Sequence, residues 1–297
     1  MGKRADIKTG FVCNNNCLFC VQAHKKQQGN RTTQEIKSYL KEAKKSGCDS
    51  IVFTGGEPTI RDDIVELVSF AYSLGFERIQ LQTNARMLSS LSLCKELINA
   101  GANEFSPALH GHIPELHDYL TRAKGSYAQT VQAIRNLKQL NQCVITNTVV
   151  VKPNYRYLPE LAQLFVSLRV DQFQFAFVHA VGNAYRYYDQ MMPWVSIAAP
   201  YIKKGLQIGI DNGIKVMAEA MPFCTMKGYE QYCSEWFIPE TEIRDGTEYD
   251  PDYKKTRTTQ GKLKHAKCKT CIHDNYCEGP WREYPEKRGF EEFVAVR

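Results

Sequence analysis

Three cysteines near the amino terminus have the type and spacing of metal ligands. Cys13, Cys17 and Cys20 are separated by three and then two residues, in a polar stretch rich in asparagine. Thiolates ligate iron-sulfur clusters, and three of them would hold three irons of a four-iron cluster while leaving the fourth iron open to another ligand. Spacing alone also allows a structural zinc knuckle, for which His24 is the nearest fourth ligand, or a chance grouping of thiols.

A second motif follows at the end of the next expected strand. The residues at 54–59 are Thr-Gly-Gly-Glu-Pro-Thr, and they come directly after the short apolar run at 51–53. The two motifs in this order, with the aromatic Phe19 before the last cysteine, resemble the signature of the radical S-adenosylmethionine (SAM) superfamily. Neither motif is specific by itself, whereas the pair is.

The resemblance implies a [4Fe-4S] cluster and SAM as cofactors. Cys13, Cys17 and Cys20 would ligate the cluster, whose open iron chelates the amino and carboxylate groups of SAM. One-electron reduction cleaves SAM to methionine and a 5'-deoxyadenosyl radical, which takes a hydrogen atom from a substrate. We therefore expect an enzyme, with a one-electron donor such as flavodoxin or ferredoxin as its partner.

Contacts to SAM are expected from several strand ends. Gly55 and Gly56 would let the backbone approach SAM closely, and Glu57, or the backbone beside it, would accept a hydrogen bond from the SAM ammonium. The resemblance adds Phe19 against the adenine, Asn84 near SAM, Arg122 for the SAM carboxylate and Asn147 for the ribose. Each of the last three also has an ordinary structural role open to it: turn chemistry, a solvated helix end and a buried strand residue.

Two histidines near the fourth strand need a separate interpretation. His110 and His117 have side chains that can act as acid-base groups near neutral pH. Such histidines are more often structural, so we assign them no catalytic role. Ala108 stands where related enzymes often have a serine, which removes one hydroxyl contact to SAM.

Strands and helices alternate along the first two thirds of the chain. Six expected βα units end near residue 180, a long helix is expected at 193–211 and another strand at 214–217. This alternation predicts parallel βαβ units, and six units are fewer than the eight of a closed barrel. The resemblance implies an open, partial barrel, so the prediction is an α/β fold: a partial (βα)6 TIM-like barrel over residues 1–212 and a small, loop-rich iron-sulfur region over residues 213–297.

Cysteines are also concentrated near the carboxyl terminus. Cys268, Cys271 and Cys277 are separated by two and five residues, which resembles the core of the SPASM/twitch auxiliary-cluster motif. The later cysteines of the full motif are absent, so the resemblance implies one auxiliary [4Fe-4S] cluster. Cys224 is favoured over Cys233 as the fourth ligand, and a structural zinc site on the same thiolates remains the alternative.

Composition limits where the protein works and what it binds. The chain has 297 residues, a formal charge of +6 and 11 cysteines, with neither an apolar run of membrane-spanning length nor a secretory signal. We therefore expect a cytoplasmic protein whose thiols are metal ligands or buried side chains. We expect no membrane partner, and the basic runs are too short to predict a nucleic-acid partner.

The resemblance leaves the substrate open between small molecules and peptides. Because the chain begins directly at the barrel, we expect a small polar substrate, which would undergo oxidation, epimerisation or bond formation. Peptide maturation is the alternative reaction, and a zinc-stapled binding module is the non-enzymatic alternative. If Cys224 completes the auxiliary cluster, Cys233 is a free thiol: it is then a candidate hydrogen donor to a substrate radical, although the more ordinary expectation is a surface thiol in a loop.

Overall fold

A mostly parallel β-sheet forms the centre of the protein. In the computed structural model, residues 2–246 and 248–297 are described, and they form a sheet of nine strands in the order β7-β6-β5-β4-β3-β2-β1-β8-β9. The strands are β1 (Lys3–Lys8), β2 (Cys48–Thr54), β3 (Arg78–Thr83), β4 (Glu104–Pro107), β5 (Cys143–Val150), β6 (Gln172–Phe177), β7 (Lys215–Glu219), β8 (Thr241–Arg244) and β9 (Tyr249–Asp250). Only the β8–β9 pair is antiparallel among these described strands.

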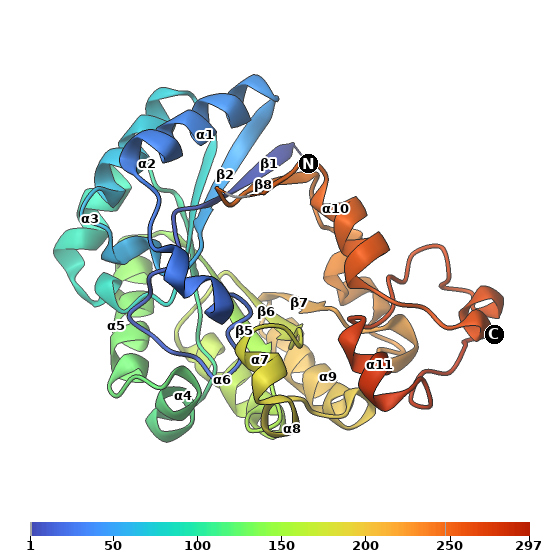
Figure 1. Cartoon of the computed structure of the whole chain (residues 1–297). Helices are drawn as coiled ribbons and strands as arrows, with labels where there is room; N and C mark the ends of the chain where they lie inside the picture. The colour runs from blue at the N-terminus through green and yellow to red at the C-terminus, as the bar shows by residue number, and fades with distance from the viewer. Residues whose placement is uncertain (1, 247) are drawn as a thin grey trace.

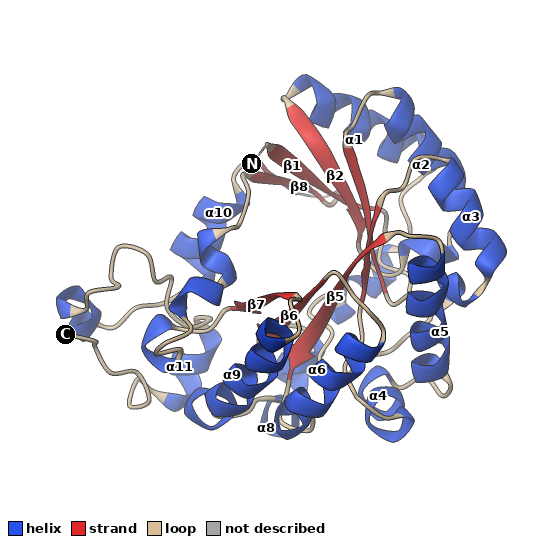
Figure 2. Cartoon of the chain, turned by 180° about the vertical axis from the view of Figure 1, so that it is seen from behind, coloured by secondary structure: helices blue, strands red, loops and turns tan. Residues whose placement is uncertain are grey.

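Helices cover the outer face of the curved sheet (Figures 1 and 2). The α-helices of the described residues are α1 (Thr33–Lys45), α2 (Ile64–Ser73), α3 (Leu91–Asn99), α4 (Pro114–Thr121), α5 (Ser126–Gln139), α6 (Leu158–Ser167), α7 (Asn183–Arg186), α8 (Tyr188–Met191), α9 (Val195–Asp211), α10 (Tyr253–Thr256) and α11 (Glu283–Arg288). Of these, α10 and α11 lie to the side of the sheet and not on its outer face. The predicted partial barrel is confirmed. Among the described residues, no helix is long and apolar enough to cross a lipid bilayer.

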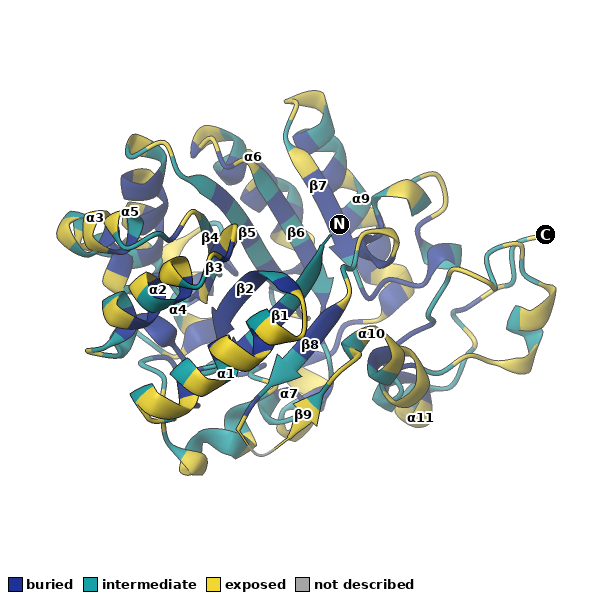
Figure 3. Cartoon of the chain, turned by 90° about the horizontal axis from the view of Figure 1, so that it is seen from above, coloured by how far each residue is buried: buried dark blue, intermediate teal, exposed yellow. Residues whose placement is uncertain are grey.

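Alternation along each strand separates a packed outer face from a polar inner face. On β6, Phe173, Phe175 and Phe177 are buried on the side of the helices, and the Phe173 ring lies 5.3 Å from that of Phe165 on α6. Gln172 and Gln174 point the other way, into the barrel. The helices show the matching pattern in Figure 3, with buried inner faces and exposed outer ones.

The carboxyl-terminal third adds strands to the sheet of the barrel and then continues outside it. β7, just beyond residue 212, pairs with β6, and β8 returns to pair in parallel with β1. The sheet does not close, because the described residues form no pairing between its edge strands β7 and β9. We call this opening the seam; α10 lies beside it, and Tyr253 and Thr256 of α10 line the cavity inside the barrel.

Candidate active site

The loop between β1 and β2 brings the first three cysteines to the carboxyl ends of the strands. Backbone N–H groups on both sides of Cys17 bind the end of α4: Asn16 donates to the carbonyl of Thr121 (3.0 Å) and Leu18 to that of Leu120 (2.9 Å). On the other side, the Asn183 side chain donates to the carbonyl of Cys17 (2.9 Å). The loop is therefore held in place by backbone contacts that do not involve the sulfur atoms.

The three thiols lie in one partly buried group. Burial raises the pKa of Cys13, Cys17 and Cys20, and the proximity of Cys20 and Cys13 raises that of Cys17 further. The Cys13 sulfur accepts hydrogen bonds from the Asn15 N–H (3.3 Å) and the Asn84 amide (3.7 Å). Buried, mutually close sulfurs that already attract donors fit the ligation of a cationic cluster, which stabilises thiolates.

Zinc ligation was the alternative for this loop. His24, the nearest candidate for a fourth ligand, is an exposed residue. Within 2–246 and 248–297, no group of three or more histidine, cysteine, aspartate or glutamate side chains has the geometry to hold one metal ion. A four-iron cluster places each thiolate on a different iron, so it does not require the sulfurs to converge on one point.

Gly55 and Gly56 let the end of β2 lie directly against the cysteine loop. The Gly56 N–H donates to the carbonyl of Gly10 (2.8 Å), and the Glu57 N–H donates to that of Val12 (2.9 Å). A Cβ atom added at Gly55 would lie 2.1 Å from the Gly10 oxygen, and one added at Gly56 would lie 2.1 Å from the Val12 oxygen. Glycine is therefore required here because two backbone segments approach each other closely. The sequence alone predicts a close approach of SAM instead.

Glu57 connects the ends of two strands. Its buried carboxylate accepts hydrogen bonds from the Thr59 N–H (3.0 Å) and hydroxyl (2.5 Å), the Thr83 hydroxyl (2.5 Å) and the Asn84 N–H (2.6 Å). Burial raises the pKa of Glu57, while these four donors favour its charged form. Both carboxylate oxygens are thus engaged with the protein, so the backbone is the freer acceptor at this strand end.

The turn after β3 anchors the cysteine loop. Asn84 donates its side-chain amide to the Asn14 side chain (2.6 Å), and Ala85 has a positive φ of 62°. Arg86 then donates to the carbonyl of Asn14 (2.5 Å) and to the Asn15 side chain (3.1 Å). A left-handed alanine is uncommon, and here it aims the residues on either side of it at the same loop.

Arg86 belongs to no sequence motif, so its role could not be identified from the sequence. Its contacts with the loop lead to a testable prediction. Arg86→Met removes two charge-assisted hydrogen bonds to the loop, each worth about 1.5–3 kcal/mol. We expect faster loss of iron from the reconstituted protein, measured as iron content over time after desalting. Arg135→Met is the matched control, because Arg135 is exposed on α5. Equal iron retention by both variants would contradict the anchoring role.

Phe19 packs inside the protein against a pair of histidines. Its ring lies edge-on to that of His110, with 4.7 Å between the centroids. The Nδ1 atom of His110 accepts the Val149 N–H (3.2 Å), and that of His117 accepts the His110 N–H (3.1 Å). Burial lowers the pKa of both histidines, that of His117 to about 4, so both are neutral near pH 7. These contacts favour the structural interpretation of the pair.

The histidine pair predicts a pH dependence of stability. Their pKa values are lower in the folded than in the unfolded chain, so their contribution is complete above about pH 6.5 and falls by about 1.4 kcal/mol per histidine for each pH unit below that. His117→Asn keeps a hydrogen-bond acceptor but cannot titrate. We expect its melting temperature to fall less between pH 7.5 and 5.5 than that of the unchanged protein or of the surface variant His24→Asn. The same fall in all three would contradict this assignment.

Arg122 and Asn147, both expected to contact SAM, lie in different surroundings. Arg122 is exposed in a left-handed conformation (φ 53°) at the end of α4, one residue after the carbonyl that binds the cysteine loop. Asn147 lines the barrel cavity, and its side-chain oxygen is buried without a hydrogen-bond partner among the described residues. Asn147 thus has a free acceptor toward the cavity, whereas Arg122 borders the loop from outside.

A cavity of about 880 Å³ that opens to solvent occupies the inside of the barrel. Large branched apolar side chains usually fill the interior of such barrels. Here polar side chains occupy most inward positions, including Asp6 and Lys8 of β1, Gln80 and Gln82 of β3, Gln172 and Gln174 of β6, and Glu219 of β7. Thr146 and Ser234 also line it with buried hydroxyls that have no partner among the described residues. The lining thus offers many charged and hydrogen-bonding groups to a polar molecule, beside apolar surface from residues such as Ile145, Met217 and Phe237.

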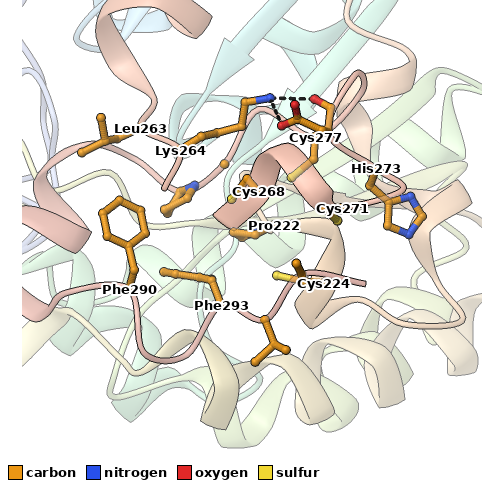
Figure 4. Close-up of a pocket in the computed structure, with 15 residues that line it drawn as sticks. Pro222, Cys224, Leu263, Lys264, Cys268, Cys271, His273, Cys277, Phe290 and Phe293 are labelled. Carbon is orange, nitrogen blue, oxygen red and sulfur yellow. Dashed lines mark hydrogen bonds and ion pairs between the residues drawn. The ribbon is translucent and has the colours of Figure 1, made fainter. Parts of the chain in front are cut away.

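The carboxyl-terminal cysteines line a second pocket (Figure 4). Cys224, Cys268, Cys271 and Cys277 surround it, together with apolar side chains such as Phe293. Burial and, after it, the nearby Cys277 raise the pKa of Cys224 to about 11. The four thiols fit a second cluster, and the structure groups Cys224 with the other three as favoured.

Cys233 does not line this pocket, although Cys277 is close enough to contribute to its raised pKa. Its side chain is fully buried, and its backbone forms an isolated bridge with Ala218 of β7. The expected surface thiol is therefore wrong, because the polar sequence around Cys233 folds against the sheet edge. Its neighbour Ser234 lines the barrel cavity, whereas Cys233 does not. A role as hydrogen donor would require a movement that exposes the sulfur to the cavity.

The two cysteines make a matched test of the second pocket. Cys224→Ser should lower the iron content to that of one cluster, because Cys224 lines the pocket. Cys233→Ser should keep the iron of both clusters and mainly lower the melting temperature, because it places a hydroxyl in a buried position. Iron and sulfide analysis of both variants checks this. Loss of the second cluster in Cys233→Ser alone would reverse the ligand assignment.

Comparison with known proteins shows the family. The sequence profile of the radical SAM superfamily matches residues 7–165, more than half of the chain. An AdoMet-dependent heme synthase from Oleidesulfovibrio alaskensis is 31% identical over 158 residues, which are 52% of this chain and 40% of that protein. A PqqA peptide cyclase from Rhodopseudomonas palustris is 29% identical over 183 residues, 61% of this chain and 48% of that protein. The chain thus spans less than half of either relative.

The fold continues beyond the matched segment. The crystal structure of Streptococcus suis SuiB bound to its precursor peptide SuiA has a TM-score of 0.70 against this structure, at 15% identity. The similarity covers 96% of this chain and 72% of SuiB. At this identity the likeness is one of fold, and it includes the carboxyl-terminal region as well as the barrel.

Proposed function

Because the chain belongs to the radical SAM superfamily, we propose that it takes a hydrogen atom from a polar substrate bound in the barrel cavity. The family uses SAM and a [4Fe-4S] cluster, which together supply the 5'-deoxyadenosyl radical upon one-electron reduction. Cys13, Cys17 and Cys20 would hold the cluster. The electrons would come from a small donor protein such as flavodoxin or ferredoxin.

The strand ends around the loop would orient SAM. Glu57 has both carboxylate oxygens engaged, so we assign the ammonium contact to the backbone at 55–57 and give Glu57 a positioning role. Asn147 would offer its unpaired oxygen to the ribose, and Asn84 would hold the loop beside SAM. Phe19 would border the adenine, and Arg122 would reach the SAM carboxylate from the end of α4.

The polar cavity is the observation that carries the substrate class. A hydrogen-abstracting radical is formed at the carboxyl ends of the strands, and the space below them is lined by charged and amide side chains. Such a lining favours a polar substrate, since desolvating these groups against an apolar one would be costly. The first candidate is a small polar molecule that is oxidised, epimerised or joined to another group.

A peptide is the second candidate. SuiB binds a precursor peptide and the cyclase acts on PqqA, and the sheet of this chain is not closed, with α10 beside the seam. An extended chain that entered there would contact α10, whose Tyr253 and Thr256 line the cavity. The four thiols of the second pocket would hold an auxiliary [4Fe-4S] cluster close to the same side.

Anaerobic reconstitution tests the proposal. The protein with iron, sulfide, SAM and dithionite should form 5'-deoxyadenosine, and a true substrate should raise its yield and transfer deuterium into it. Libraries of polar metabolites and of short peptides separate the two candidates. A protein that binds zinc, shows no iron-sulfur absorption and has no affinity for SAM would instead be the stapled binding module.

A further inference from the structure

Two arginines that line the cavity at the amino-terminal ends of the strands have no anionic partner among the described residues. Arg4 of β1 and Arg78 of β3 both line the cavity, on either side of Ser50 of β2. The strand register places Arg4 opposite Ser50 and Ser50 opposite Arg78, so the three residues form one row across three neighbouring strands. Thr241 of β8 continues the row on the other side of Arg4.

Neither guanidinium makes an ion pair or a hydrogen bond with any residue that the structure describes, and the Nε atom of Arg4 is buried. A buried charged donor without a partner is costly. Arg78 is exposed to the cavity side of the sheet and has no contact that would hold its side chain elsewhere. The row therefore presents two guanidinium groups without an anionic partner, and one hydroxyl group, to the barrel cavity.

Two carboxylates that line the cavity two residues above the row are engaged with other residues. Asp6 accepts hydrogen bonds from Lys8 (2.9 Å) and Thr54 (2.5 Å), and lies two residues further up β1. Glu104 accepts a hydrogen bond from Gln80, its neighbour in the register, two residues above Arg78. An anion from outside the chain would thus meet no competing carboxylate in the row itself.

We infer that Arg4, Ser50 and Arg78 bind an anionic group of the substrate, a carboxylate or a phosphate. Guanidinium groups on alternate strands are about 10 Å apart at the backbone, and their long side chains can converge on one group above Ser50. Arginine is well suited to both anions, because its planar fork donates two parallel hydrogen bonds. The inference rests on the proposed function, which makes this cavity the substrate site.

The position of the row restricts the substrate further. Arg4 lies four residues below Lys8, the last residue of β1, so the row is roughly 13 Å below the carboxyl ends of the strands. The radical forms at those ends. The substrate should therefore carry its anionic group roughly 13 Å from the carbon that loses hydrogen, a distance that an extended peptide of four residues or a nucleotide can span.

Calorimetry with simple anions tests the site. The reconstituted protein with SAM is titrated with inorganic phosphate and, separately, with glutarate, at an ionic strength held constant with sodium chloride. We expect one site for at least one probe, weakened tenfold or more by Arg4→Gln and by Arg78→Gln. Arg135→Gln, on the outer face of α5, should bind as the unchanged protein does. Binding of phosphate alone, glutarate alone or both identifies the anion class.

Other outcomes overturn the inference. They are the absence of saturable binding for both probes, or an equal loss of affinity in Arg135→Gln. Arg78→Gln decides even if Arg4→Gln does not fold, because Arg78 is exposed and has no structural contact. Formation of 5'-deoxyadenosine by the unchanged protein reports on the proposed function separately. Radical formation without anion binding rejects only this site, whereas anion binding without radical formation rejects only the proposed function.

Discussion

Replacing Cys13, Cys17 and Cys20 together by alanine should abolish SAM cleavage while leaving a second iron-sulfur cluster in place. The three thiols are the ligands expected for the cluster that reduces SAM, and the other pocket is lined by different cysteines. The loop itself is held by backbone hydrogen bonds to α4, so the variant should fold. We expect the iron content to fall from about eight to about four atoms per chain.

The measurements are iron and sulfide analysis, the visible spectrum, and 5'-deoxyadenosine formed with dithionite. Cys94→Ala is the control, because Cys94 is a buried thiol that belongs to neither set and donates only to the Leu88 carbonyl. It should keep both clusters and full SAM cleavage. Continued 5'-deoxyadenosine formation by the triple variant would contradict the assignment of the loop cysteines as cluster ligands. Loss of all iron from this variant would contradict the presence of a second cluster.

Most of the barrel could be predicted because its pattern is local. Apolar residues face the helices at a spacing set by each element itself, as Phe173, Phe175 and Phe177 do on β6. Thr32 and Glu35 form the capping box that starts α1, and a glycine follows several helices. The same regularity placed both signature motifs at strand ends, where the structure has them.

The parts that were missed depend on distant partners. β8 has only four residues, two of them charged, and exists as a strand because β1 lies beside it. The sequence around Cys233 is polar, yet pairing with Ala218 buries it. Neither pairing is encoded in a periodicity, so each could be found only after the chain had been folded.

The candidate site divides in the same way. The grouping of the thiols that we propose as metal ligands could be predicted, since thiol spacing within one loop is a local feature. The supporting residues could not: Arg86 reaches the loop from the end of β3, and Glu57 meets Thr83 across two strands. Their roles follow from the register of neighbouring strands and not from any spacing along the chain.

The glycines after β2 provide the second large effect, because the collision expected there involves backbone atoms. A Cβ atom at Gly56 would lie 2.1 Å from the Val12 oxygen and 2.6 Å from the Phe11 carbonyl carbon. Alanine and valine place this atom identically. We therefore expect both Gly56→Ala and Gly56→Val to displace the start of the cysteine loop, at a cost of about 1–3 kcal/mol or more.

The two substitutions distinguish this explanation from the one that the sequence suggested. If glycine served only to leave room for SAM, alanine would be tolerated far better than valine, and only SAM affinity would change. If glycine lets two backbones meet, Gly56→Ala already lowers both cluster retention and the melting temperature. Gly47→Ala is the control for lost stability alone: its positive φ strains alanine and should lower the melting temperature, but an added Cβ there would contact nothing within 4 Å, so iron content and SAM affinity should not change. The measurements are iron content, melting temperature and SAM affinity. If Gly56→Ala keeps its iron and its stability while Gly56→Val loses only its affinity for SAM, then the glycine is required by the ligand and not by the loop.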